Sequence, residues 1–586
     1  FFNQGNNENN SQTNRQYIIA NQEGQRYIED QWANSTNNNH RFNFRLEHDI
    51  DSNNSLVFTP RISLQQNVSN RTTDAGTSLT SGQLLNTLLN DNQNDNLGIN
   101  LNGNLLYRHK FKKEGRTIST NFTGGYNQRN GQQFQYSLSE FFGDNVDSIS
   151  LVDQVGDNLS DGYNFGTDIS FTEKIGKKSM LQFNYSPSYS RSNADKTTYE
   201  FDPLTGMYSE VDTLLSSVFN NINITQRTGI SYRFGGEKLN FQLRMNYQNR
   251  VIMNEQTLPT DREVRLVFNN LLPMASIRYK LSKTKHLRLF YSTNTHTPSV
   301  NQLQDVVDNS NPLRLRSGNA ALEQEFDHRL VLRYNSTNPE KASSFYVFVR
   351  GEYKSDYITN ATTIAQSDTL LQGNVLLREG AQYTRPENLD GAWNVRAQSS
   401  YGRPINKLKS NLNLNLGAGY LVTPGMINEI RNESNTLNLN SGITLSSNIS
   451  EKIDFRVGYT YNYNVVNNSV IPQAFNTYQI HTPSGSVTWL PWKKLVLSSS
   501  IYANSYLGLE EEFNQTVLLW NAGIGFKFLK NELAEIRLSG FDLLNNNNSI
   551  IRNVTDYYIE DLQTQVLNRY FMLTLTYNLR RFGEGK

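Results

Sequence analysis

Histidine is the first residue type in this chain that could bind a transition metal. The sequence contains seven histidines, which are His40, His48, His109, His286, His296, His328 and His481. None forms a close pair at the spacing that places two ligands on one helix face, and they are scattered along the chain. We therefore expect surface or interfacial histidines, with no metal site and no cofactor.

Oxygen ligands for calcium are a second candidate. Residues 90–96 and 202–212 are rich in Asp and Asn. Their order does not match the twelve-residue calcium loop of helix-loop-helix proteins. We interpret both segments as solvated loops.

Nucleophilic catalysis would need a serine, a histidine and an acid to converge. The nearest string to a Gly-x-Ser-x-Gly elbow is Pro483-Ser484-Gly485-Ser486, which lacks the first glycine and lies in a strand pattern. We expect no catalytic residues and no enzymatic activity.

Arginines offer a third chemistry, the binding of an anionic solute. Besides the segment 327–329, the candidates are Arg244, Arg265, Arg278, Arg288, Arg350 and Arg456. The alternative is that they pair with carboxylates inside a polar interior and keep it hydrated. We favour this alternative, so substrate-binding residues remain unknown.

The composition indicates that strands position these residues. Hydrophobic residues make up 37% of the 586 residues, with 31 Tyr and 30 Phe, whereas globular proteins have about 45–50% apolar residues. No segment approaches the roughly 20 apolar residues of a membrane helix. The net charge of +1 gives no attraction to nucleic acid, and the absence of cysteine excludes disulfides and Cys-based zinc sites. The chain begins at Phe1 without signal-peptide features, so we expect a signal peptide to lie outside this sequence.

Alternation with a period of two residues recurs along the chain. Apolar residues alternate with polar ones over residues 97–107, 411–420, 453–463 and 571–580. Successive side chains of a strand point to opposite faces, so each strand has one apolar and one polar face. Strands of about ten residues or more match membrane-crossing strands better than the five or six residues typical of globular proteins.

Short polar connections separate these strands in pairs. Ten of them lie at residues 51–54, 112–116, 176–178, 235–238, 282–286, 338–342, 406–409, 448–452, 491–494 and 531–534. Longer polar stretches lie between them, at residues 67–96, 129–161, 192–216, 296–325, 467–474 and 546–568. Short turns on one side and long loops on the other are typical of outer-membrane barrels. The pattern predicts an all-β fold, a transmembrane antiparallel β-barrel of about 22 strands with short periplasmic turns and long extracellular loops.

The first and last strands of the barrel, and one extension of its wall, are predicted from their own sequence segments. Residues 40–50 are predicted to form a strand. Its partner is either a stub at Phe1 and Phe2 or residues 15–21, and we favour the stub. We interpret residues 3–39 as a long outer loop with a hairpin extension. Residues 361–381 are expected to hold a strand extension above the membrane. An open strand edge has no partner in lipid, so the last strand, residues 569–582, should pair with the first.

Three stretches resemble a known family. They are TPSVNQLQDVVDNSNPLRLRSGNAALEQEF at residues 297–326, IRLSGFDLLNNNNSIIR followed by YFMLTLTYNLRRF at residues 536–582, and HRFNFRLEHDIDSNNSLVFTPRISL at residues 40–64. They are similar to the outer-membrane β-barrels of the TonB-dependent-receptor type found in Bacteroidota. Gly318, Asn319, Leu322 and Glu325 match a family segment, whereas Ala320 stands where proline is usual.

The resemblance implies a transporter barrel. In the family, a plug and often a small β-sandwich domain precede the barrel, and the TonB system supplies energy. We expect residues 1–586 to be a single outer-membrane β-barrel domain, with both preceding domains outside this sequence. Its function is then energised uptake of an unidentified solute through the bacterial outer membrane, with lipids, a plug and the TonB system as partners. The alternatives are a non-transporting barrel subunit of a secretion, assembly or lipoprotein-handling complex, which would bind a surface lipoprotein or other outer-membrane proteins, and an open diffusion porin.

Overall fold

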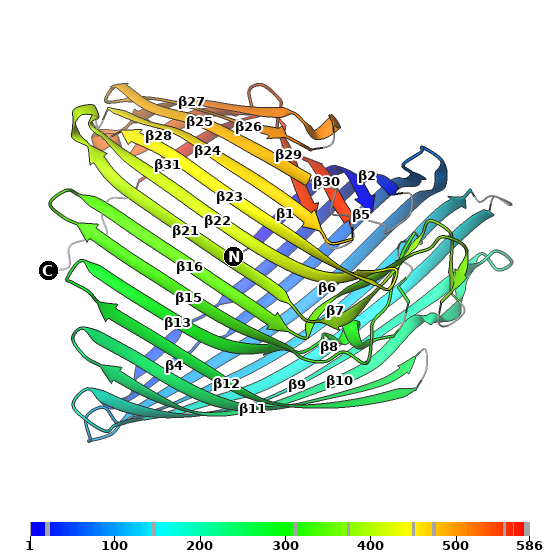
Figure 1. Cartoon of the computed structure of the whole chain (residues 1–586), viewed down its shortest axis with the longest axis horizontal. Helices are drawn as coiled ribbons and strands as arrows, with labels where there is room; N and C mark the ends of the chain where they lie inside the picture. The colour runs from blue at the N-terminus through cyan, green and yellow to red at the C-terminus, as the bar shows by residue number, and fades with distance from the viewer. Residues whose placement is uncertain are drawn as a thin grey trace.

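The computed structural model of the chain is a wide wall of long, tilted strands (Figure 1). It describes residues 2–17, 24–142, 148–258, 261–305, 307–308, 311, 313–371, 375–447, 450, 452–470, 476–509, 511–554, 558–566 and 568–578. No helix in this part of the chain is long and apolar enough to cross a membrane.

Strands make up nearly all of the described chain. The first half contains β1 (Phe2–Tyr17), β2 (Gln25–Asn43), β3 (Leu46–Asp49), β4 (Asn54–Phe58), β5 (Arg61–Leu79), β6 (Leu84–Lys110), β7 (Thr117–Phe141), β8 (Ser148–Lys174), β9 (Ser179–Asp202), β10 (Met207–Gly235), β11 (Leu239–Leu258), β12 (Arg262–Lys280) and β13 (Lys285–His296). The middle contains α1 (Val300–Leu303), β14 (Arg314–Arg316), β15 (Glu325–Asn338), β16 (Ser343–Ser355), β17 (Tyr357–Ile364), β18 (Thr369–Leu370), β19 (Leu376–Leu377), β20 (Gln382–Leu389) and β21 (Ala392–Ile405). The last part contains η2 (Asn406–Leu408), β22 (Ser410–Ile427), β23 (Ile430–Ser447), β24 (Ile453–Asn468), β25 (Asn476–Trp492), β26 (Leu495–Leu507), η3 (Glu511–Phe513), β27 (Thr516–Phe528), η4 (Lys530–Glu532), β28 (Ala534–Phe541), β29 (Asn548–Val554), β30 (Tyr558–Gln565) and β31 (Tyr570–Tyr577).

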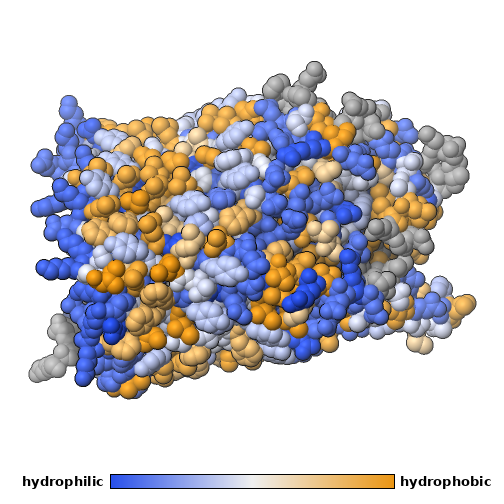
Figure 2. All heavy atoms as spheres, turned by 60° about the horizontal axis from the view of Figure 1, so that its bottom comes forward, coloured by the Kyte–Doolittle hydropathy of each residue, from blue (hydrophilic) through white to orange (hydrophobic). Residues whose placement is uncertain are grey.

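The two faces of the wall differ in polarity, as the alternation predicts. In β6, Leu97 and Leu101 are exposed on the outer face, whereas Asn90 and Asn92 line a cavity inside the barrel. Figure 2 shows hydrophobic residues gathered over the wall near the short turns, with a hydrophilic rim at the turns themselves. The outer face therefore suits lipid, and the inner face suits water.

This difference between the faces can be tested on β11. Leu243 is exposed on the outer face, and the preceding residue, Gln242, points inward and donates to Ser231 Oγ at 2.9 Å. Arginine on the lipid face costs up to about 2–4 kcal/mol near the bilayer midplane. We expect Leu243→Arg to lower the unfolding free energy in lipid vesicles by that order, and Gln242→Arg to change it much less. Equal losses in a urea titration would contradict the assignment of the faces.

The predicted short turns are confirmed, because each lies between two consecutive, paired strands. In the turn predicted at residues 448–452, residues 448, 449 and 451 lie outside the described residues. In the first turn, the Asp51 carboxylate accepts from the backbone N–H groups of Asn53 and Asn54, at 2.7 and 2.9 Å. These hydrogen bonds stabilise the charged form and lower the pKa of Asp51.

Three of the long stretches predicted as loops are strands over most of their length. Residues 67–96 belong to β5 and β6 apart from a four-residue tip, residues 129–141 and 148–161 belong to β7 and β8, and residues 192–202 and 207–216 belong to β9 and β10. The hairpin extension predicted within residues 3–39 is confirmed, and it takes up most of that segment, because β1 pairs with β2 from Phe2 to Gln16. Phe2 pairs with His40, as the favoured stub predicts. These extensions are polar on both faces because they lie beyond the lipid-facing region, so they lack the apolar alternation that marks a strand.

The wall follows the order of the chain. Ladder pairing leads from β1 through β2 and β5 to β6 and then strand by strand to β28 and β31, without β14, β17–β20, β29 and β30. Counting β2 with β3 and β4 with β5 as interrupted strands, this path crosses 22 strands, which is the predicted number. The second interruption contains Pro60, which has no N–H to donate to a ladder.

β1 meets the strand before the last over part of its length. Ser11–Tyr17 of β1 pair with Tyr558–Thr564 of β30. The pairing predicted between β1 and the last strand, residues 569–582, is not found among the described residues. Below this ladder, the described residues of β31 pair with β28, and residues 2–10 of β1 pair with β2. The predicted closing strand extends to residue 582, and its end lies outside the described residues.

Candidate solute site inside the barrel

One outer loop lies inside the barrel. The chain leaves β13 at His296, forms α1 and β14, and rejoins the wall at Glu325 of β15. β13 and β15 are the eleventh and twelfth strands of the wall, on the side opposite β1 and β2. Arg314 of β14 nevertheless forms an ion pair with Glu29 of β2, with Nη2 and Oε2 3.0 Å apart. The loop, residues 297–324, therefore crosses the interior; we call it the crossing segment.

A second insertion supports the crossing segment. It contains β17 to β20, between β16 and β21, and its β20 lies parallel to β14. Gln382 N donates to Leu313 O at 2.9 Å, and Ser317 N donates to Thr384 O at 3.1 Å. The predicted strand extension at residues 361–381 is thus partly confirmed, but it lies inside the barrel and pairs with the crossing segment.

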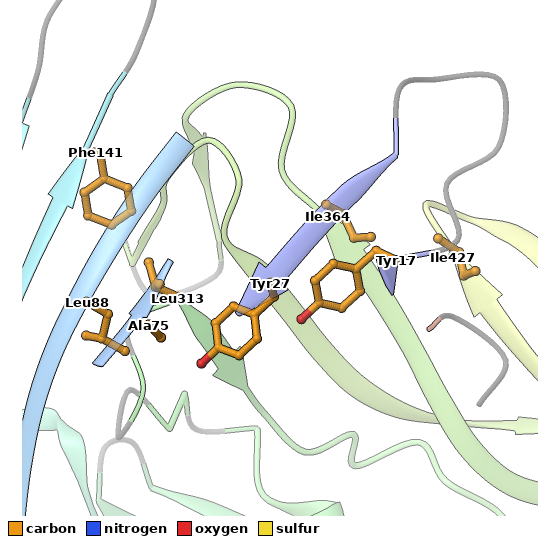
Figure 3. Close-up of a cluster of buried hydrophobic side chains, with 8 residues drawn as sticks. All are labelled: Tyr17, Tyr27, Ala75, Leu88, Phe141, Leu313, Ile364 and Ile427. Carbon is orange, nitrogen blue, oxygen red and sulfur yellow. The ribbon is translucent and has the colours of Figure 1, made fainter. Parts of the chain in front are cut away.

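An apolar cluster joins both insertions to the wall. It consists of Tyr17, Tyr27, Ala75, Leu88, Phe141, Leu313, Ile364 and Ile427. Leu313 and Ile364 come from the insertions and are almost fully buried. Figure 3 shows the rings of Tyr17 and Tyr27 in the middle of the cluster. Removal of this apolar surface from water holds the insertions inside the outer half of the barrel.

Charged residues reinforce the same region. Arg15 Nε donates to Glu560 Oε2 at 2.9 Å, and their side chains are only 10% and 9% exposed. The Arg15 guanidinium lies 4.4 Å from the centre of the Tyr558 ring, and that of Arg314 lies 4.9 Å from the Tyr27 ring. This anchoring cluster connects β1, β2, β30 and the crossing segment, and it consists of Arg15, Tyr17, Tyr27, Glu29, Arg314, Tyr558 and Glu560.

Gly318 explains how the crossing segment folds back on itself. Its N–H donates to Gln304 O at 2.6 Å, and Asn319 N donates to Gln302 O at 2.6 Å. A Cβ atom on Gly318 would lie 2.1 Å from Gln304 O. Only glycine permits this approach of two backbones.

Two other residues of this stretch fix its end. Leu322 is 3% exposed, and Glu325 accepts from Lys354 Nζ at 2.6 Å where β15 begins. The matching residues of the motif at 318–325 therefore serve the fold of the crossing segment and its return to the wall.

Polar cavities lie between the crossing segment and the wall. One, of about 510 Å³, is lined by Asn90, Asn92 and Asn94 of β6 and by Asp308, Arg314 and Arg316 of the crossing segment. Another, of about 900 Å³, lies between the segment and β6 to β10. Arg316 lines both cavities. Amides, carboxylates and guanidinium groups of this kind suit a small polar solute rather than an apolar one.

A sequence profile of the outer membrane protein β-barrel family matches residues 109–577. The chain belongs to this family. It is therefore an outer-membrane protein, as the sequence predicts. No curated protein sequence matches the chain.

Several solved barrels are similar to this family member in outline. The ferric citrate transporter FecA has 8% identity and a TM-score of 0.41, with 96% of this chain and 78% of the FecA chain covered. The siderophore receptor PiuA from Acinetobacter baumannii has 9% identity and a TM-score of 0.42, with 96% and 82% covered. The Serratia marcescens hemophore receptor HasR has 8% identity and a TM-score of 0.42, with 96% and 80% covered.

The barrel fold separates the six arginines singled out in the sequence. Arg265 lies in the same alternating set of β12 as the exposed Val267 and Leu271, on the outer face. A luminal role for Arg265 is therefore wrong. The inner-face set comprises Arg244, Arg278, Arg288, Arg350 and Arg456, judged by the exposed apolar residues beside them.

The prediction that these arginines pair with carboxylates is confirmed for only some of the inner-face arginines. Arg350 forms an ion pair with Glu352, which also lies 3.4 Å from Arg329. Arg329 also lies 3.6 Å from Asp327, so the segment 327–329 does form part of a luminal charge network. Arg244, Arg278 and Arg288 form no ion pair among the described residues.

The barrel leaves the histidines apart from one another. His328 and His481 are hydrogen-bonded to Tyr291 and Tyr459, at 3.0 and 2.7 Å. In the part of the chain that the structure covers, no group of three His, Asp or Glu side chains could hold a metal ion.

The two Asp- and Asn-rich segments, which the sequence predicts to be solvated loops, lie largely in strands. Residues 90–96 are part of β6, and Asp202 ends β9, where its carboxylate accepts from Leu204 N at 2.8 Å. Residues 483–486 lie in β25, which agrees with the expected strand.

Proposed function

We propose that this chain is the barrel of a TonB-dependent-receptor-type transporter and that a polar solute binds between its wall and the crossing segment. The observation that supports this most directly is the fixed position of the crossing segment inside the outer half of a polar interior. A solute arriving from outside meets cavities of about 510 and 900 Å³ before it reaches the rest of the lumen.

A wall of 22 strands is too wide for its own side chains to fill, and barrels of this size are plugged transporters. We therefore place a plug domain in the inner half, and TonB as the source of energy. Residues 1–586 form the single barrel domain in this proposal.

Growth on single nutrients tests the proposal. A strain lacking the gene is compared with its parent on a panel of defined carbon, iron and phosphate sources, and the panel is repeated without TonB. We expect the same nutrient-specific loss in both strains. No loss, or uptake that continues without TonB, would contradict energised import and favour a subunit of a larger complex.

A matched pair of variants links the nutrient to the cavities. Arg316→Ala removes a guanidinium that lines both cavities, whereas Arg45→Ala removes an exposed arginine that pairs with Glu47 near the short turns. We expect uptake of the identified nutrient to fall about tenfold in the first variant alone, since one lost charged hydrogen bond costs about 1.5–3 kcal/mol. Equal amounts of folded barrel in the membrane serve as the control.

A further inference from the structure

Three arginines lie directly opposite one another on the inner wall. The register pairs Arg278 of β12 with Arg288 of β13, and Arg288 with Arg333 of β15. Their neighbours Ile277, Leu289 and Leu332 belong to the alternate, outer set. All three arginines are exposed, close to the short turns that face the periplasm in barrels of this type.

This arrangement is unfavourable on its own. Opposed residues of an antiparallel pair have Cβ atoms about 4.5–5.5 Å apart, and like charges at this distance destabilise a sheet. Arg333 lies over the ring of Phe348, at 5.5 Å, and none of the three forms an ion pair with a described carboxylate. An anion that bridges the guanidinium groups would remove this repulsion.

The positive charge continues along the wall. Arg350 of β16 is opposite Arg396 of β21, one step further from the turns. On β15 and β16, the inner face carries carboxylates only above this step, where Glu352, Asp327 and Glu325 are matched by Arg329 and Lys354. From Arg396 down to the turns, the inner-facing strand positions of β11 to β21 contain no carboxylate.

We propose that Arg278, Arg288 and Arg333 form a luminal relay site for an anionic solute bearing carboxylate or phosphate groups. The proposal rests on the transport function proposed above and names its substrate class. Guanidinium groups bind both kinds of anion through two parallel hydrogen bonds. A cavity lined by one sign of charge concentrates the opposite ion, so the site lies where a solute released from the outer cavities would next be held.

Calorimetry on the purified full-length protein in detergent tests the site. The probes are citrate and inorganic phosphate at about 50 mM ionic strength, because higher salt screens the interaction. We expect at least one of them to bind the wild-type protein. The triple variant Arg278→Gln/Arg288→Gln/Arg333→Gln should bind at least tenfold more weakly. The matched variant Arg265→Gln, on the outer face of β12, should bind as the wild type does.

A lysine triple variant at the same positions separates charge from folding. It should retain part of the affinity, and the thermal unfolding of each variant shows that the barrel is intact. If citrate binds and phosphate does not, the site is specific for carboxylates. If phosphate binds and citrate does not, the site is specific for phosphate groups.

Absence of binding by either anion, or equal binding by the glutamine variant, overturns the proposal. The proposal is also overturned if the glutamine variant keeps its anion affinity and differs from the wild type only in how readily a protease cleaves the plug. The arginines would then be a docking surface for the plug. Anion binding does not need TonB, so this result is independent of the growth test.

Discussion

Glu560→Ala is expected to destabilise the barrel by about 3–5 kcal/mol, because it leaves the Arg15 guanidinium buried without its carboxylate. The pair joins β1, the first strand of the wall, to β30, and the two strands also share a ladder. The measurement is urea-induced unfolding in lipid vesicles, followed by tryptophan fluorescence. Heat treatment before electrophoresis should also convert the variant to its unfolded mobility at a lower temperature.

The double variant Arg15→Met/Glu560→Met is the control. Apolar residues of similar length can replace a buried ion pair with little loss. We expect the double variant to be more stable than Glu560→Ala. If Glu560→Ala unfolds as the wild type does, the anchoring cluster does not stabilise the contact between β1 and β30.

Gly318→Val is expected to displace the crossing segment from the interior. A Cβ atom at this position would lie 2.1 Å from Gln304 O and 2.6 Å from Gln304 C, and neither backbone atom can move without the segment. Overpacking typically costs about 1–3 kcal/mol. The wall is held by hydrogen bonds between its own strands. We therefore expect the valine side chain to displace the crossing segment and to leave the barrel folded.

Planar-bilayer recording measures the consequence of Gly318→Val. Ions crossing the barrel formed by residues 1–586 pass the crossing segment, so its release should raise the single-channel conductance several-fold. Gly103→Val is the matched control, because no atom lies within 4 Å of a Cβ at Gly103 in β6. Unchanged conductance in a folded Gly318→Val barrel would show that the segment does not restrict the lumen.

The membrane part of the fold was predictable from local sequence. Leu97 and Leu101 share the lipid face, and the turn at Asp51 closes a hairpin through its own carboxylate. These signals require only residues within about ten positions of one another. The strand extensions beyond the lipid were missed because both of their faces meet water.

The candidate site was not predictable in the same way. The segment at residues 296–325 contains a four-residue helix and a three-residue strand, so neither period appears in its sequence. Its position depends on Arg314 and Glu29, which are 285 residues apart. The pair Gly318-Asn319 was the one sequence feature that could have indicated this fold, because a glycine in a family motif often marks a place where two backbone segments lie very close together.

The ion pair between Arg15 and Glu560 has a consequence for biogenesis. Its partners are separated by 545 residues, so it cannot form until nearly the whole polypeptide has been translated and inserted. Contacts between residues so far apart in the sequence slow folding, because the loop between them must be closed first. The Arg314 bond to Glu29 belongs to the same cluster. The crossing segment should therefore reach its final position only after both ends of the chain have been inserted, so a chain stalled before residue 560 would leave the interior without this anchor.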